Sequence, residues 1–144
     1  MKLFTIGFTR SKAAHFFGRL QAAGVTRVHD TRLNRTSQLA GFAKQDDLAF
    51  FLERIGGIGY RVEALLAPTA EMLDAYRAKQ IGWDEYARRY LDLLVARRVE
   101  QRIAPGELDH HCLLCSEATP EHCHRRLAAD YLSDTVGGLE IVHL

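Results

Sequence analysis

The alternation of hydrophobic and polar positions predicts strands and helices that follow one another along the chain. Residues 4–6 form a short apolar run typical of a buried strand, and a helical apolar stripe follows over 11–23. Gly24 stands where a left-handed helix cap belongs, and residues 25–30 indicate a second strand. Because such a strand–helix–strand unit usually forms a parallel pair through a right-handed crossover, we expect an α/β fold.

The rest of the chain continues this pattern. The expected elements are a helix over 46–55, an edge strand within 58–66, a helical insert over 69–98, a buried strand over 111–115, a helix from Thr119-Pro120-Glu121 and a strand over 139–144. The prediction is therefore a single three-layer α/β domain over residues 1–144. It has a mainly parallel sheet of about four or five strands, and the helical insert covers 69–98.

Length, composition and charge narrow the class of protein. The 144 residues are 47% hydrophobic and 26% charged, as expected of one globular domain with its own core. The net charge of +1 argues against a broadly basic surface, so a nucleic-acid site would be a local patch. No apolar stretch is long enough for a signal peptide or a membrane span, so we expect a cytoplasmic protein with no membrane partner.

Three cysteines stand close together in the sequence, at Cys112, Cys115 and Cys123. Their odd number fits reduced thiols better than a disulfide framework. Cys112 and Cys115 point to opposite faces of the expected strand, which places Cys112 in the core. Together with Cys123 and His124 they have the ligand types of a structural zinc site, but the strand geometry opposes it. We therefore assign no metal ligands and no cofactor, and zinc remains an alternative.

The segment 113–125 holds most of the residues that can carry chemistry. Cys115 and Glu117 follow the carboxyl end of a strand, and Cys123, His124 and Arg125 lie in the opening turns of the expected helix. In an open α/β sheet the carboxyl ends of the strands form the ligand crevice, and helix N-termini there attract anions. Helix phase turns Cys123 and His124 inward, whereas Arg125 either bends toward an anion or faces water.

The other wall of the crevice is expected from the first two strands. Asp30 and Arg32 end the second strand on one side of the sheet, where they either bind a ligand or form a structural ion pair. Gly7 ends the first strand and allows a ligand or backbone to approach closely. Ser37 lies in the polar loop that follows the second strand.

These stretches resemble the signature blocks of the DUF488 family, a domain of unknown function. The matching blocks are Thr5-Ile6-Gly7-Phe8, the run from Gly24-Val25 to Asp30-Thr31-Arg32 with Ser37, and Leu114-Cys115-Ser116-Glu117 with Pro120 and Cys123-His124-Arg125. The resemblance implies an intracellular α/β domain and no particular reaction. Its polar signature residues correspond here to Asp30, Arg32, Cys115, Glu117, Cys123, His124 and Arg125. The chain departs from the family pattern at Asn34-Arg35, where a proline usually follows.

Two functions fit these residues. The first is an enzyme acting on an anionic substrate that bears phosphate, such as a nucleotide or nucleic acid. Cys115 or Cys123 would be its nucleophile and Glu117 or His124 its proton-transfer group. Its substrate-binding residues would be Gly7, Asp30, Arg32, Ser37 and Arg125. The second is a non-catalytic binding module in which the Cys/His cluster is structural or binds zinc.

Overall fold

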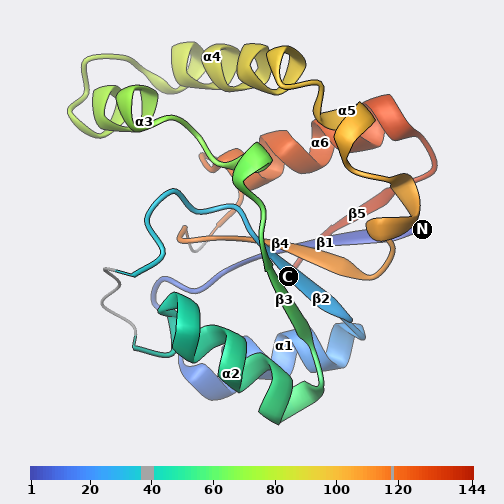
Figure 1. Cartoon of the computed structure of the whole chain (residues 1–144). Helices are drawn as coiled ribbons and strands as arrows, with labels where there is room; N and C mark the ends of the chain where they lie inside the picture. The colour runs from blue at the N-terminus through green and yellow to red at the C-terminus, as the bar shows by residue number, and fades with distance from the viewer. Residues whose placement is uncertain (37–40, 118) are drawn as a thin grey trace.

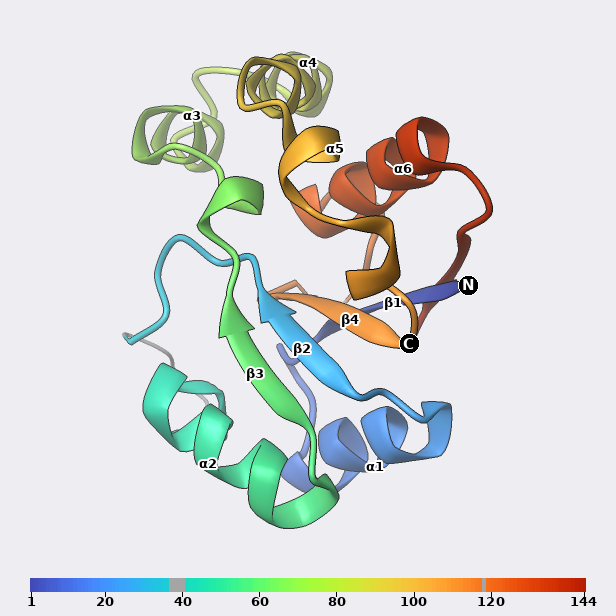
Figure 2. The ribbon, with the colours of Figure 1, turned by 45° about the vertical axis from the view of Figure 1, so that its right-hand side comes forward.

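A parallel sheet forms the centre of the molecule, as seen in a computed structural model that describes residues 1–36, 41–117 and 119–144. Its strands are β1 (Lys2–Gly7), β2 (Arg27–Asp30), β3 (Gly59–Val62), β4 (His111–Cys115) and β5 (Glu140–His143). Their order across the sheet is β3-β2-β4-β1-β5, and every neighbouring pair is parallel. Figures 1 and 2 show this sheet from two directions. The α/β class is confirmed, and β3 is an edge strand as predicted.

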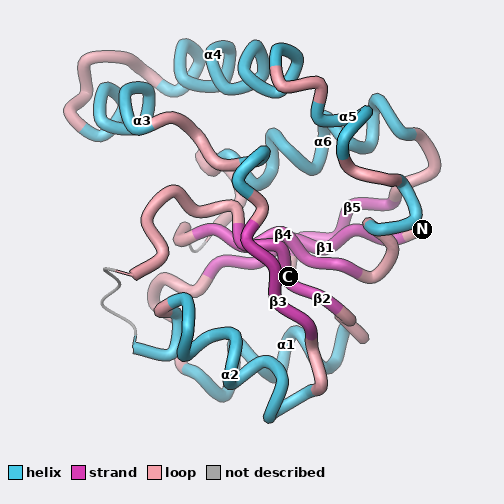
Figure 3. The backbone as a smooth tube through the Cα atoms, viewed as in Figure 1, coloured by secondary structure: helices cyan, strands magenta, loops and turns pink. Residues whose placement is uncertain are grey.

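Helices cover both faces of the sheet, which makes three layers (Figures 1 and 3). The described helices are α1 (Ala13–Ala23), α2 (Gln45–Gly56), α3 (Ala70–Arg77), α4 (Trp83–Ala96), α5 (Val99–Arg102) and α6 (His124–Val136), with short 3-10 turns η1 (Gly41–Ala43), η2 (Ala64–Leu66) and η3 (Pro105–Glu107). One face is covered by α1 and α2, and the other by α6. In Figure 1, α3 and α4 lie outside α6, so the insert adds helices beyond the third layer.

Alternation along the strands separates two cores. In β4, Cys112 and Leu114 pack in the core under α1 and α2, whereas Leu113 packs in the core under α6. The same alternation continues to the strand's last residue, so Cys115 faces the α6 side. All of these side chains are buried, as expected for a parallel sheet with both faces covered.

The start of α6 differs from the sequence prediction. We expected the helix to begin at Thr119-Pro120-Glu121, but it begins at His124, and Cys123 is its N-cap with an extended backbone (φ −136°, ψ 137°). The buried positions of α6, Arg125 among them, place its first turn against the sheet. Residues 119–123 instead carry the chain from the rim of the sheet to that point. Tertiary packing thus outweighs the helix-start signal of Pro120.

The connections reverse direction between β1 and β4. The chain leaves β1 through α1 on one face to reach β2, and it leaves β4 through α6 on the other face to reach β5. In open α/β sheets, ligands bind outside the carboxyl ends of the strands at such a switch point. Here Gly7 and Cys115 are paired in register at this point. None of the described helices is both long and apolar enough to cross a membrane.

Candidate functional site

A cavity of about 90 Å³ lies at the carboxyl edge of the sheet, on the α6 side. Cys115 and Glu117 line it from the end of β4, and Cys123 and His124 line it from the start of α6. The loop after β2 and the helices α3 and α4 complete its walls. The four residues that the sequence singled out for catalysis therefore meet in one cavity.

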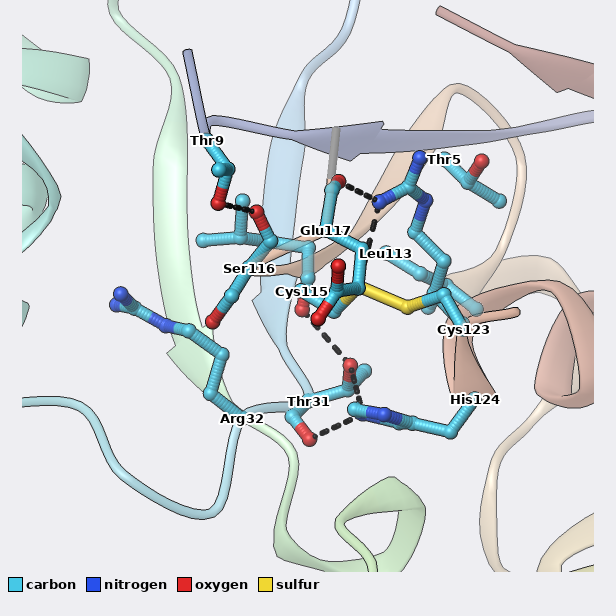
Figure 4. The surroundings of a disulfide bond; sticks show 12 residues. Thr5, Thr9, Thr31, Arg32, Leu113, Cys115, Ser116, Glu117, Cys123 and His124 are labelled. Atoms are coloured by element: carbon cyan, nitrogen blue, oxygen red, sulfur yellow. Dashed lines mark hydrogen bonds between the residues drawn. A yellow bond between two sulfur atoms is a disulfide. The ribbon is translucent and has the colours of Figure 1, made fainter. Parts of the chain in front are cut away.

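The two cysteines of this cavity are joined by a disulfide, Cys115–Cys123, which Figure 4 shows beside Glu117, Thr31 and His124. The prediction that all three cysteines are reduced thiols is thus wrong for this pair. Counting cysteines could not show that the end of β4 and the N-cap of α6 converge at the switch point. Cys112 is free and buried in the opposite core, as predicted, and burial raises the pKa of its thiol.

His124 is held by the residue that follows β2. Its Nε2 lies 2.8 Å from the carbonyl oxygen of Thr31 and 3.1 Å from the Thr31 hydroxyl (Figure 4). Because a carbonyl oxygen only accepts, Nε2 carries the proton and Nδ1 carries a lone pair. Burial, together with the positive charges of Arg125 and Arg77, lowers the pKa of His124 to about 4. His124 is therefore neutral at pH 7.

Glu117 is held through its backbone and not through its side chain. Its carbonyl oxygen accepts a hydrogen bond from Arg125 Nη1 at 2.5 Å. The preceding carbonyl, of Ser116, accepts from the hydroxyl of Thr9 and from its backbone N–H (Figure 4). The Glu117 side chain is exposed at the cavity. Its carboxylate can therefore take up or release a proton on a bound molecule.

Arg125 lies behind the disulfide and does not line the cavity. The sequence prediction turned its side chain toward an anion or water, but the guanidinium is completely buried. The helix starts so close to the sheet that its second residue faces inward. Arg125 Nη1 donates to Cys115 Sγ at 3.2 Å, whereas Nε and Nη2 have no hydrogen-bond partner among the described residues. Burial lowers the pKa of Arg125 to about 10.

Gly7 makes room for this arrangement. A Cβ atom added at Gly7 would lie 1.5 Å from the Glu117 carbonyl oxygen and 2.5 Å from Arg125 Nη1. The close approach expected at Gly7 is therefore that of backbone and a guanidinium. Gly7 itself is buried and is not among the residues that line the cavity.

Asp30 and Arg32 form an ion pair whose charged groups lie on the face of the sheet that α1 and α2 cover, although Arg32 is also among the residues that line the cavity. Arg32 Nη2 lies 2.7 Å from Asp30 Oδ2, its Nε donates to Asp30 Oδ1 at 2.9 Å, and its Nη1 donates to the Ala43 carbonyl at 2.7 Å. Tyr60 donates a further hydrogen bond to Asp30. Of the two interpretations left open by the sequence, this geometry favours the structural ion pair. In Figure 4 the Arg32 side chain points away from the disulfide.

Ser37, which was expected to bind substrate, lies outside the residues that the structure describes. Other residues belong to the site but were not predicted from the sequence. Thr31 was passed over although its parity along β2, opposite to that of Asp30, places it on the α6 side. Arg77 lines the cavity from the last turn of α3, but no motif marks it within the helical insert. Tyr76 and Tyr86 form an aromatic wall, with ring centroids 4.9 Å apart.

Comparison with known proteins identifies the family but no activity. The family described as "Domain of unknown function DUF488" matches residues 12–132 of this chain. No curated protein and no solved structure matches the chain significantly. Within the ranges that the structure describes, no group of three or more His, Cys, Asp or Glu side chains is placed to hold a metal ion. The matched segment covers most of the 144 residues and contains the cavity's cysteines, Glu117 and His124, and the chain belongs to the DUF488 family.

Proposed function

We propose that this protein is an enzyme acting on an anionic substrate in the cavity beside the disulfide. The phosphate-bearing class, a nucleotide or nucleic acid, fits best. The observation that carries the proposal is the convergence of Cys115, Glu117, Cys123 and His124 with Arg77 on one cavity. The cavity is small, at about 90 Å³. It would hold one phosphate-sized group while the rest of the substrate lies outside.

Arg77 is the group that we assign to the anion. Its side chain is exposed, and among the described residues it takes part in no ion pair. Its positive charge lowers the pKa of both His124 and Tyr86, so its field acts on the cavity's other groups. The first turn of α6 also points its backbone N–H groups toward this end of the cavity, since Cys123 is the N-cap. Arg32, already held by Asp30, has a structural role in this proposal.

Glu117 is assigned the proton transfer and His124 a hydrogen bond to the substrate. The Glu117 carboxylate is exposed at the cavity, and its backbone is fixed by Arg125. His124 is neutral and offers the lone pair of Nδ1, so it accepts a hydrogen bond from a hydroxyl or amine of the substrate. A thiol nucleophile at Cys115 or Cys123 is released when the disulfide is reduced.

A melting-temperature screen tests the anion site. We would add inorganic phosphate, nucleoside monophosphates and short single-stranded RNA to the protein with and without dithiothreitol. A binder raises the melting temperature because it binds the folded state only. Arg77→Gln should weaken binding about tenfold, as expected for a lost charge-assisted hydrogen bond. Arg88→Gln, an exposed arginine paired with Glu85 on α4, serves as the control. Equal shifts in wild type and Arg77→Gln would contradict the proposal.

Measuring whether the protein converts a bound ligand distinguishes the enzyme hypothesis from the binding-module hypothesis. The disulfide favours the module as a second candidate, because it ties β4 to α6 and can act as a structural node. If the protein is an enzyme, Glu117→Gln keeps the ligand-induced melting shift and loses about 10²- to 10⁴-fold in rate. If it is a module, neither protein converts the ligand. Metal analysis of the purified protein tests the zinc alternative, and cell fractionation tests the cytoplasmic compartment that we propose.

A further inference from the structure

Arg125 is a buried cation without a carboxylate. It is the largest of the fully buried side chains, and no described acidic residue forms an ion pair with it. Two of its nitrogen atoms, Nε and Nη2, are buried and find no hydrogen-bond partner within the part of the chain that the structure describes. Burying a charge without a partner is costly, so an anion that forms beside this guanidinium in another state of the protein would be strongly stabilised by it.

The atom placed to become that anion is Cys115 Sγ. It lies 3.2 Å from Arg125 Nη1, and the same nitrogen is fixed by the carbonyl oxygen of Glu117. The absence of a side chain at Gly7 allows this contact. In the disulfide the sulfur is neutral. After reduction it can carry a full negative charge directly against the guanidinium.

We propose that Cys115 and Cys123 form a reversible dithiol–disulfide couple that exchanges electrons with low-molecular-weight thiols and disulfides through the cavity, and that Arg125 is the positioning residue that holds Cys115 as a thiolate. The proposal adds a redox activity to the site. It does not depend on the anionic substrate proposed above. Both cysteines line the cavity but are almost fully buried, with 1% and 3% of their surface exposed, so an external sulfur would have to reach them through the cavity.

The different surroundings of Cys115 and Cys123 determine the order in which bonds form and break. An external thiolate attacks Cys123 Sγ; the bond between Cys123 and Cys115 breaks, and its electron pair leaves on Cys115 Sγ beside Arg125. A second thiolate then attacks the external sulfur of the mixed disulfide. Cys123 Sγ leaves and takes a proton from water, while the two external thiols are oxidised to a disulfide. The protein pair gains two electrons and retains one proton, on Cys123.

Cys115 is the better leaving group of the two. The thiol with the lower pKa leaves faster in such exchanges, and only Cys115 has a guanidinium hydrogen-bonded to its sulfur. Cys123 is the N-cap of α6, where the helix dipole gives a thiolate weaker support. The other titratable side chains at the cavity are Glu117, His122, His124, Arg32, Arg77, Tyr76 and Tyr86, and Arg32 is already paired with Asp30. Of these, Glu117 opposes the thiolate, Arg77 supports it, and His124 is neutral.

Alkylation across pH tests the thiolate directly. Each reduced variant is treated with iodoacetamide from pH 5 to 10, and the labelled cysteine is identified by mass spectrometry. In Cys123→Ser, Cys115 should react with a pKa at least about one unit below the usual value of about 8.5. In Cys123→Ser/Arg125→Met that pKa should rise by one unit or more, and Arg125→Lys should restore part of the shift. Cys112, buried in the other core, should label only after denaturation and serves as the internal control.

The proposal is overturned if the pKa of Cys115 in Cys123→Ser is about 8.5 or higher, or if Arg125→Met leaves it unchanged. Should the double variant fail to fold, the Cys123→Ser value decides alone. A second measurement uses wild type equilibrated in mixtures of reduced and oxidised dithiothreitol. We expect one two-electron transition and a reduction equilibrium constant at least about tenfold smaller in Arg125→Met, which corresponds to about 30 mV. If Arg125→Met leaves the reduction equilibrium constant unchanged, the proposed role of Arg125 is overturned.

The mixed disulfide gives the third test. Cys115→Ser treated with a chromogenic aromatic disulfide should retain the probe on Cys123, and Cys123→Ser should react through Cys115 with the faster rate. No mixed disulfide on either cysteine would overturn exchange through the cavity. None of these measurements uses phosphate or a nucleotide. A failure of the anion site, read in Arg77→Gln by melting temperature, therefore remains distinct from a failure of the redox couple.

Discussion

Two buried arginines lie at the same edge of the sheet, one on each face, and they differ in how their charge is balanced. Arg32 is clamped by both carboxylate oxygens of Asp30 and by the Ala43 carbonyl. Arg125 touches a sulfur and one carbonyl, and two of its nitrogens have no partner among the described residues. The first arrangement is complete as it stands, whereas the second lacks an anion.

The difference shows that burial alone does not reveal what an arginine does. Arg32 reaches its carboxylate two residues away along the chain, so the pair pins the loop after β2. Arg125 lies against the backbone of β1 and of the segment after β4, and no carboxylate of the described residues forms an ion pair with it. Loss of the charge should therefore destabilise the folded protein strongly at Arg32 and only slightly at Arg125.

The largest effect is expected from Arg32→Met. This change leaves Asp30 fully buried without its cation, and breaking a buried ion pair from one side costs about 3–5 kcal/mol of unfolding free energy. Urea denaturation followed by circular dichroism measures the loss. Arg126→Met, whose ion pair with Asp130 is exposed, is the control and should change stability by less than about 0.5 kcal/mol. A small effect at Arg32 would remove the contrast with Arg125.

Gly7→Ala should be the next most damaging change. The new Cβ would lie 1.5 Å from the Glu117 carbonyl oxygen, so β1 or the segment after β4 must move. We expect a loss of about 3 kcal/mol, at the upper end for overpacking, together with slower alkylation of Cys115 in the reduced protein. Gly18→Ala, in the middle of α1 with open space around its Cβ, should instead stabilise by up to about 1 kcal/mol. Similar stabilities for the two variants would show that the backbone at Gly7 yields easily.

The stability of the folded protein should also depend on pH, because the pKa of His124, a neighbour of Arg125, is lowered. The pKa of His124 is about 4 in the folded protein against an ordinary value of 6.5, so the unfolded chain binds more protons between these values. Stability is therefore complete above about pH 6.5 and falls toward pH 4, by about 1–3 kcal/mol. His111, with a pKa also lowered to about 4, adds to the same window.

Denaturation curves at intervals between pH 4 and 7.5 measure this fall. His124→Gln should remove part of it, and His15→Gln, exposed on α1, is the control. Arg125→Met removes a positive charge that lowers the pKa of His124, so it should make the fall smaller. An unchanged curve in His124→Gln would show that His124 is not the neutral, half-buried histidine described above.

The smallest effect is expected for Arg125→Met in the oxidised protein. Replacing a buried cation that lacks an ion-pair partner by an apolar side chain of similar length is often neutral, so stability should change by about 1 kcal/mol or less. The comparison is made by urea denaturation without reductant, next to Arg32→Met. A loss of several kcal/mol would mean that Arg125 is a structural residue like Arg32.

The sequence predicted the strands and the helix-capping glycine well because these depend on local patterns. Gly24 ends α1 in the left-handed conformation, as predicted. Cys112 lies in the core because strand alternation is a local rule. The start of α6 was misplaced because residues 119–123 carry a strong helix-start pattern that packing at the rim outweighs. Arg77 was missed because its importance depends only on where the helical insert folds.

Sequence by itself thus determined the α/β class, the edge position of β3 and the segment 113–125 that supplies the cavity's cysteines. Periodicity and turn residues encode these features within short stretches. Only the tertiary structure decided that Cys115 meets Cys123, that Arg32 is neutralised and that Arg125 is not. These outcomes depend on which elements converge at the switch point between β1 and β4. Spacing along the chain does not report distances across a sheet, and charge balance is set by those distances.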